Sequence, residues 1–191
     1  MKPRLLIIGA GGHGRSVVEA VDASGAFDVV GFLDDAFPGT GAVWDIPVLG
    51  RVFDWRQFTA HVDCWFVAIG NNALRSAITC LLAEAGMRLA TVVHPKAIVS
   101  PRAITGAGSA VMAGAVVGTE AVLGPGVIVN CGAVIDHHCR VGDFGHLGVG
   151  AVMAGGSVLG EGAWMQANAS LGYGVVIERG RVLAPGEAVS R

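Results

Sequence analysis

A glycine-rich turn near the N-terminus is the first motif in the sequence that could do chemistry. Gly9, Gly11 and Gly14 have the G-x-G-x-x-G spacing. Such a turn lets a ligand approach the backbone, and the N–H groups of the following helix attract an anion such as a pyrophosphate. Asp34 follows at the distance where a dinucleotide site keeps the acid that binds a ribose hydroxyl. The motif predicts a nucleotide-binding turn, with a glycine turn that holds no ligand as the alternative.

A second reactive segment lies in the other half of the chain, where histidines and acids gather. The run Asp136-His137-His138 is followed by Asp143 and by His146. An unperturbed imidazole titrates at about pH 6.5. A histidine of this segment could therefore take a proton from a nucleophile near neutral pH.

The histidines belong to a segment with a period of six residues. From Ala97 to Arg191 the chain divides into consecutive hexads without an insertion, and 15 of the 16 third positions are aliphatic, Thr105 being the exception. This period fits neither a helix nor a plain strand, but it fits short strands joined by turns. Glycine, at 30 of 191 residues, suits the tight corners. The pattern therefore predicts that these units stack into a parallel β-helix whose core is a column of aliphatic side chains.

The first 95 residues predict a different fold, a small parallel sheet with helices on its faces. Apolar runs indicate strands at 4–8, 29–33 and 65–69, and helical patterns follow the first and the third. A complete dinucleotide fold needs about six strands, so only one mononucleotide-binding half fits before the repeats. We therefore expect two domains, 1–95 and 96–191.

The composition excludes several classes of function. The net charge is −2 without a basic run, so nucleic acid is not an expected partner. Apolar stretches are short and broken by glycine, and none approaches the roughly 18 residues of a membrane span. The N-terminus lacks the pattern of a signal peptide, so we expect a cytoplasmic protein. The four cysteines form no C-x-x-C pair, so we expect neither a disulfide framework nor a metal site.

Together these motifs resemble the bacterial sugar O- and N-acyltransferases of the hexapeptide-repeat class. This family includes sialic acid O-acetyltransferases and the N-acetyltransferases of nucleotide-linked 4-amino sugars. The resemblance covers nearly all of the chain and rests on Gly9 to Gly14, Leu33-Asp34-Asp35, Ile46 to Gly50, Ala68 to Asn71 with Arg75, His94-Pro95, and residues 130–146. It implies a Rossmann-like N-terminal domain, then a left-handed β-helix of about five coils, in subunits that form homotrimers.

The resemblance also implies where the substrates bind. The N-terminal domain would hold a nucleotide sugar and the β-helix would hold acetyl-CoA, with no metal. The residues that match nucleotide-sugar positions of the family are Gly11, Gly12, His13, Gly14, Asp34, Asp35, Asn71, Arg75 and Asn130. An Asn130 side chain that forms a ladder inside the coil is an equally good interpretation of that position.

Two positions of the repeats match the catalytic and acetyl-CoA-binding positions of the family, and the coil spacing adds a third candidate. His137 matches its general base, and His146 matches a second histidine close to acetyl-CoA. Because half a coil separates them, these two would converge only across a subunit boundary. Gly155, one coil after His137, is a candidate for binding acetyl-CoA and donating its N–H to the oxyanion.

One position departs from the family. His138 stands where an acid usually follows the base, and an imidazole cannot stabilise an imidazolium as a carboxylate does. The candidates for the group that orients His137 are Asp136, Asp143 and a backbone carbonyl.

We expect an acetyltransferase that uses acetyl-CoA and acts on the amino group of a nucleotide-linked 4-amino sugar, UDP-linked before GDP-linked. His137 would be the general base for direct attack. Cys131 and Cys139 flank it, so a route through an acylated cysteine is also conceivable. The alternatives are an O-acetyltransferase of sialic acid or another free sugar, and a catalytically impaired nucleotide-sugar-binding trimer.

Overall fold

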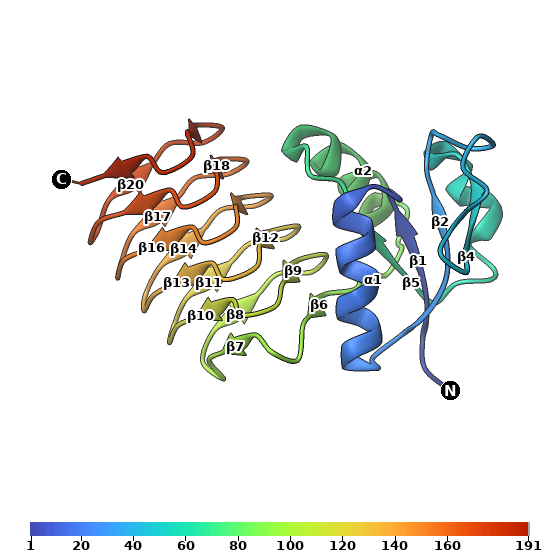
Figure 1. Ribbon diagram of the computed structural model, residues 1–191, viewed down its shortest axis with the longest axis horizontal. Helices are drawn as coiled ribbons and strands as arrows, with labels where there is room; N and C mark the ends of the chain where they lie inside the picture. The colour runs from blue at the N-terminus through green and yellow to red at the C-terminus, as the bar shows by residue number, and fades with distance from the viewer. Residues whose placement is uncertain (191) are drawn as a thin grey trace. The chain divides into compact units, whose positions relative to one another are not determined.

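The computed structural model describes residues 1–190. The chain divides into two compact units, Met1–Ala90 and Thr91–Arg191, drawn in blue to green and in yellow-green to red (Figure 1). The first unit contains all the α-helices of the described chain, and the second is built of two-residue strands. The helices α1 and α2 have 13 residues each, and no helix among the described residues is long and apolar enough to cross a membrane.

The first unit is an α/β fold with a five-stranded sheet in the order β3-β4-β2-β1-β5. All neighbours pair in parallel except β3 and β4, which pair antiparallel. The strands are β1 (Arg4–Ile8), β2 (Asp28–Leu33), β3 (Ala42–Val43), β4 (Ile46–Gly50) and β5 (Cys64–Val67). The helices are α1 (Gly12–Ser24), the 3-10 helix η1 (Val52–Phe58) and α2 (Asn72–Glu84). The predicted α/β class is confirmed.

The central strand β1 explains where a ligand site belongs in this unit. Its residues Leu5 to Ile8 are completely buried, as expected for a parallel strand covered on both faces. The chain continues from β1 to β2 on one side, and later places β5 on the other. The carboxyl ends of these three strands meet at one edge, where open α/β sheets bind their ligands.

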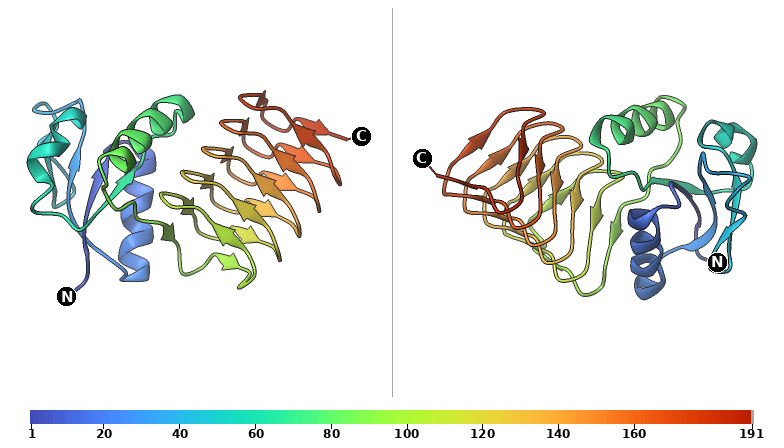
Figure 2. Two further views of the ribbon diagram at one scale, coloured as in Figure 1. Left: turned by 180° about the vertical axis from the view of Figure 1, so that it is seen from behind. Right: turned by 45° about the horizontal axis from the view of Figure 1, so that its top comes forward.

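The second unit is a parallel β-helix, which confirms the prediction from the hexads. Its strands form three parallel sheets, and each strand pairs with its equivalent in the next coil, as β10 does with β13 and β13 with β16. Figures 1 and 2 show the successive coils. The strand ahead of Ala97, β6, means that the repeats start one hexad earlier than the periodicity from Ala97 indicates. The strands are β6 (Val92–Val93), β7 (Ile98–Val99), β8 (Ile104–Thr105), β9 (Ala110–Val111), β10 (Val116–Val117), β11 (Val122–Leu123), β12 (Ile128–Val129), β13 (Val134–Ile135), β14 (Arg140–Val141), β15 (His146–Leu147), β16 (Val152–Met153), β17 (Val158–Leu159), β18 (Trp164–Met165), β19 (Ser170–Leu171), β20 (Val176–Ile177), β21 (Val182–Leu183) and β22 (Ala188–Val189).

The aliphatic third positions of the hexads form the core of the β-helix. From Val111 to Leu183 the third positions are all buried to within a few per cent. Small residues at the first positions, such as Ala115, Ala133 and Ala151, are completely buried beside them. Because each coil repeats the last one, residues one coil apart occupy equivalent positions, and side chains at a corner stack in columns.

Candidate active site

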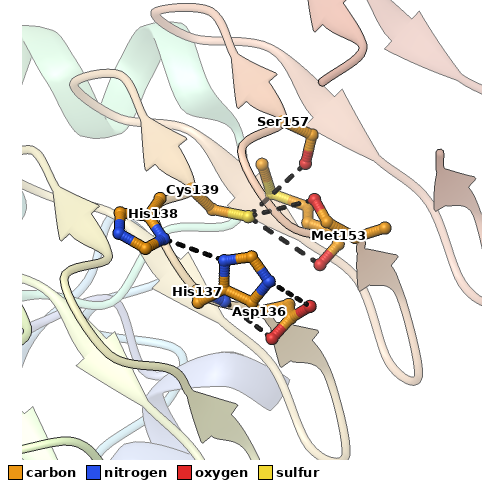
Figure 3. Close-up of polar contacts among 7 residues, drawn as sticks. Asp136, His137, His138, Cys139, Met153 and Ser157 are labelled. Carbon is orange, nitrogen blue, oxygen red and sulfur yellow. Dashed lines mark hydrogen bonds and ion pairs between the residues drawn. The ribbon is translucent and has the colours of Figure 1, made fainter. Parts of the chain in front are cut away.

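The segment Asp136 to His138 forms the turn that follows β13. Asp136 Oδ1 accepts a hydrogen bond from the backbone N–H of His137 (2.7 Å), and Asp136 Oδ2 lies 3.6 Å from His137 Nε2. Figure 3 shows the carboxylate on one side of the His137 ring. A carboxylate in this place can stabilise the imidazolium that forms when Nε2 takes a proton.

His138 lies on the other side of the His137 ring (Figure 3). The two Nδ1 atoms are 2.8 Å apart and the rings are nearly perpendicular, at 86°. His138 Nε2 lies 2.9 Å from Glu120 Oε2. Glu120 was not among the residues predicted from the sequence. It occupies the position of His138 in the preceding coil, so a search for acids one coil away would have found it.

Glu120 and His138 occupy the same corner of consecutive coils, and both have a left-handed backbone with φ of 58°. The next two coils have glycine at this corner, Gly156 and Gly174. A side chain in this conformation costs roughly 1–2 kcal/mol per residue, whereas an exposed ion pair contributes about 0–1 kcal/mol. The pair is more than half exposed. The ion pair therefore contributes too little stability to explain why Glu120 and His138 replace glycine at this corner.

Gly155 lies against the ring of His137 from the next coil. A Cβ atom added there would be 2.5 Å from His137 Cε1 and 2.6 Å from Nε2. The coils are joined beside this point by the hydrogen bond from Gly156 N–H to His137 O (2.9 Å). The His137 ring can therefore occupy this position only because Gly155 has no side chain.

The cysteines near His137 do not form a nucleophilic centre. Cys139 is completely buried, and its Sγ faces Ser157 Oγ (3.5 Å) and the backbone oxygen of Ala154 (3.2 Å) in the core (Figure 3). Cys131 is partly buried in the turn after β12. This arrangement favours direct attack over an acylated Cys139. Among residues 1–190, no three His, Cys, Asp or Glu side chains are placed to hold a metal ion.

His146 lies in β15, in a different sheet of the β-helix from β13. Its ring is buried and stacks on Trp164, one coil later, with centroids 5.3 Å apart. Asn130 follows β12, and its Oδ1 accepts the backbone N–H of Cys131 (2.9 Å), so the side chain closes its own turn. Neither residue belongs to the cluster around His137.

The glycine turn after β1 borders a small hollow in the N-terminal unit. The hollow has a volume of about 160 Å³ and is lined by Ala10, Gly11, Arg15, Asp34, Ala36 and Thr40. Nothing lies within 4 Å of a Cβ added at Gly11 or Gly12, whereas one at Gly14 would meet the backbone oxygen of Gly9. Gly14 therefore serves the packing of α1, and Gly11 and Gly12 leave the backbone open to a ligand.

The two acids after β2 hold the loops around this hollow. Asp34 accepts the backbone N–H of Ala10 (2.8 Å) on one oxygen and that of Ala36 (2.9 Å) on the other. Asp35 accepts the N–H of Val52 (3.0 Å). Each carboxylate oxygen has a further lone pair, so Asp34 can shape the turn and still face a ligand in the hollow.

Arg75 and Asn71 shape the loop that follows β5. Arg75 is completely buried and donates to the backbone oxygens of Ile69 (3.0 Å) and Gly70 (3.2 Å), and burial lowers its pKa to about 10. Asn71 caps α2, since its Oδ1 accepts the N–H of Leu74 (2.9 Å). Both side chains are used inside the unit and position the loop at the ligand-binding edge of the sheet.

His13, in the first turn of α1, is held neutral. Burial lowers the pKa of His13 to about 4, and the charge of Arg75 adds to this effect. Its Nε2 is buried without a hydrogen-bond partner among the described residues. An unpaired buried nitrogen is costly, and here it leaves a hydrogen-bonding group next to the glycine turn.

Acid is expected to destabilise the fold through His13. Its folded pKa of about 4 lies below the ordinary 6.5, so between these values the unfolded chain binds a proton that the folded chain does not. The stability gained from the neutral form is complete above pH 6.5 and is lost as the pH falls toward 4. Going from pH 7.5 to 5 should lower the free energy of unfolding by about 2 kcal/mol through this residue. Urea denaturation of the wild type and of His13→Gln at both pH values measures this loss. If the difference in the free energy of unfolding between wild type and variant did not change with pH, the prediction would be contradicted.

Comparison with known proteins shows which proteins this chain is similar to. The family model of the PglD N-terminal domain matches residues 4–82. The UDP-N-acetylbacillosamine N-acetyltransferase of Bacillus subtilis is 32% identical over 109 residues, which are 56% of this chain and 50% of that protein. The chain thus matches about half the length of this curated relative.

Two solved structures are similar over nearly their whole length. The acetyltransferase domain of PglB from Neisseria gonorrhoeae is 38% identical with a TM-score of 0.80, covering 100% of this chain and 97% of that one. It has also been solved with acetyl coenzyme A. PerB from Caulobacter crescentus, solved with CoA and GDP-perosamine, is 34% identical with a TM-score of 0.85, covering 96% and 90%. Two further structures are histidine variants of this GDP-perosamine N-acetyltransferase, to alanine and to asparagine.

Proposed function

The chain belongs to the PglD-type family of sugar N-acetyltransferases with a hexapeptide β-helix, and on this basis we propose that it acetylates the amino group of a nucleotide-linked 4-amino sugar with acetyl-CoA. The observation that carries the proposal is the environment of His137. Its half-exposed ring lies between a carboxylate and a second imidazole and faces the bare backbone of Gly155. The relatives supply the substrate class, since they are solved with acetyl coenzyme A or with CoA and a nucleotide sugar.

His137 is the general base in this proposal. As the amine attacks the thioester carbonyl, a C–N bond forms and the amine loses a proton to His137 Nε2. The C–S bond then breaks, and the proton passes to the departing thiolate. The carboxylate of Asp136, 3.6 Å from Nε2, stabilises the imidazolium in between. The N–H of Gly155 is our candidate for the oxyanion donor, and the sequence of steps needs no cysteine.

The glycine turn and the hollow beside it are the proposed binding site of the nucleotide. The backbone N–H groups at the start of α1 attract phosphate. Asp34 lines the hollow and would contact the ribose. His13, neutral and with a buried Nε2 that lacks a partner among residues 1–190, would hydrogen-bond the ligand. A UDP-linked sugar is our first choice and a GDP-linked sugar the second.

A methyl group at Gly11 is expected to weaken nucleotide binding without weakening the fold. Gly11→Ala places its Cβ where nothing lies within 4 Å, so stability should stay within about 0.5 kcal/mol of wild type. A phosphate held on the backbone would lose its close approach, and the Kd for UDP should rise at least about tenfold. Calorimetric titration with UDP measures this. Gly41→Ala, also in open space, is the matched control, and equal affinity of both variants would contradict the site.

A homotrimer is part of the proposal. His137 lies in the turn after β13, and His146 lies in β15, a strand of a different sheet, so we infer that they serve one site only if it forms between subunits. In the sheet that contains β7, β10, β13 and β16, the second residue of each hexad points outward and is apolar over these four coils. Two of these residues, Ile98 and Val152, are exposed. Exposed apolar columns of this kind mark interfaces. Sedimentation equilibrium should give the mass of three chains, and the mass of one chain would contradict it.

The reaction is tested by thiol release from acetyl-CoA with a panel of UDP- and GDP-linked 4-amino sugars, the same sugars without nucleotide, and sialic acid. We expect turnover with a nucleotide-linked amino sugar only. Turnover restricted to free sugars or sialic acid would replace the proposal by O- or N-acetylation of a free sugar. No turnover alongside UDP-dependent thermal stabilisation would favour a binding protein.

A further inference from the structure

A carboxylate reaches His137 indirectly, across two coils of the β-helix. Glu120 Oε2 lies 2.9 Å from His138 Nε2, and His138 Nδ1 lies 2.8 Å from His137 Nδ1. The chain of contacts therefore runs from Glu120 through His138 to His137. It ends on Nδ1 of His137, whereas Nε2 is the ring nitrogen that lies 3.6 Å from Asp136 Oδ2.

The proton positions along this chain follow from the groups themselves. A carboxylate only accepts hydrogen bonds, and a neutral imidazole has one N–H and one acceptor nitrogen. Glu120 therefore requires the proton of His138 on Nε2, which makes Nδ1 of His138 an acceptor. The Nδ1 of His137 must then be the donor. As a result, Nε2 of His137 carries a lone pair. Asp136 Oδ2 lies 3.6 Å from Nε2, which is too long for a hydrogen bond that would place the proton on Nε2 instead.

We propose that Glu120 and His138 are positioning residues that hold His137 in the Nδ1–H tautomer, with its Nε2 ready to accept the proton of the substrate. The pair orients the base as a directly bonded carboxylate would, with His138 as the spacer between base and carboxylate. This explains why both residues keep a left-handed backbone at a corner where the next two coils have glycine. The effect on rate rests on the proposed function, whereas the effect on the tautomer does not.

The tautomer is measured directly by NMR of the full-length protein labelled with 15N-histidine. In the wild type we expect Nε2 of His137 to give the signal of an unprotonated nitrogen and Nδ1 that of an N–H. In Glu120→Gln the amide can either donate or accept, so His138 loses its fixed orientation and the His137 signals should show both tautomers. Glu161→Gln is the matched control, because Glu161 pairs with Arg179 across one coil at the same distance, 2.9 Å.

The kinetic test uses a variant that makes the spacer unnecessary. Glu120→Gln should lower kcat by about 10- to 50-fold, a part of what a general base contributes, and leave KM for both substrates unchanged. His138→Glu places a carboxylate directly beside His137 and should keep kcat within about fivefold of wild type. Adding Glu120→Gln to His138→Glu should then lower kcat by less than about twofold, because the two residues act through one chain of contacts.

Each outcome decides the proposal. It is overturned if His137 of the wild type has its proton on Nε2, or if Glu120→Gln changes neither tautomer nor kcat. It is also overturned if Glu120→Gln costs as much in the His138→Glu background as alone, since the loss is then not transmitted through His138. A fixed Nδ1–H tautomer that Glu120→Gln abolishes, in a protein without acetyl transfer, would support the positioning and contradict the proposed function.

Discussion

Alanine at position 137 is expected to lower kcat for acetyl transfer by about 10²- to 10⁴-fold, the range that a general base contributes. The structure offers no substitute in the same place. Asp136 lies beside His137 Nε2 at 3.6 Å but has one oxygen engaged by the backbone, and His138 faces the opposite nitrogen. The residual rate would come from the alignment of the two substrates alone.

The loss in His137→Ala should be confined to kcat. The side chain is 49% exposed, so its removal leaves no buried cavity and the stability should change by less than about 0.5 kcal/mol. Thiol release under saturating substrates measures kcat, and thermal unfolding checks the fold. His61→Ala, an exposed histidine of the N-terminal unit, is the control for removing an imidazole. A His137→Ala rate within fivefold of wild type would show that another group is the base.

The β-helix could be predicted from the sequence because its rules are local. Each hexad has one inward aliphatic residue, and the next coil repeats the pattern in register. The hairpin of β3 and β4 was not predicted, since its strands are short and one contains Pro47. A proline in a run argues against a strand, except at an edge or a chain reversal.

The predicted site residues show what a sequence pattern cannot predict. Asp34, Asn71 and Arg75 follow the strands as the sequence predicts, but their side chains bind backbone groups of the loops and of the first turn of α2. A polar side chain after a strand satisfies the N–H or C=O groups of the turn as readily as those of a ligand. Residue type and spacing cannot separate the two uses.

Glu120 was not predicted because the coil register was applied from His137 forward to Gly155 and not from His138 back to the preceding coil. Whole coils of three hexads place Glu120 in register with His138, and likewise His146 with Trp164 and Glu161 with Arg179. In each of these pairs the partners lie on adjacent coils and their side chains interact. The hexad reveals the core of a β-helix, whereas the coil reveals which surface residues meet.

A methyl group at Gly155 is expected to lower kcat by about 10- to 100-fold by displacing the base. The added Cβ would be 2.5 Å from His137 Cε1, which real Cβ atoms do not tolerate, so the ring must rotate. Rotation breaks the 2.8 Å contact with His138. Gly155 has no left-handed φ, so alanine itself fits the backbone. Gly172→Ala, whose Cβ would meet its nearest neighbour at 3.5 Å, controls for a methyl group on an adjacent coil, and kcat is measured by thiol release.

The double variant separates two roles of Gly155. If the methyl group acts by displacing the ring, then it has nothing to displace once His137 is alanine, and Gly155→Ala should cost less than about twofold in that background. If the methyl group instead disturbs the backbone N–H proposed to bind the oxyanion, the loss should persist in the His137→Ala background. A Gly155→Ala variant with wild-type kcat would contradict both roles. It would mean that the ring can leave the position it has beside Gly155 without harm, and that His137 acts from a different rotamer.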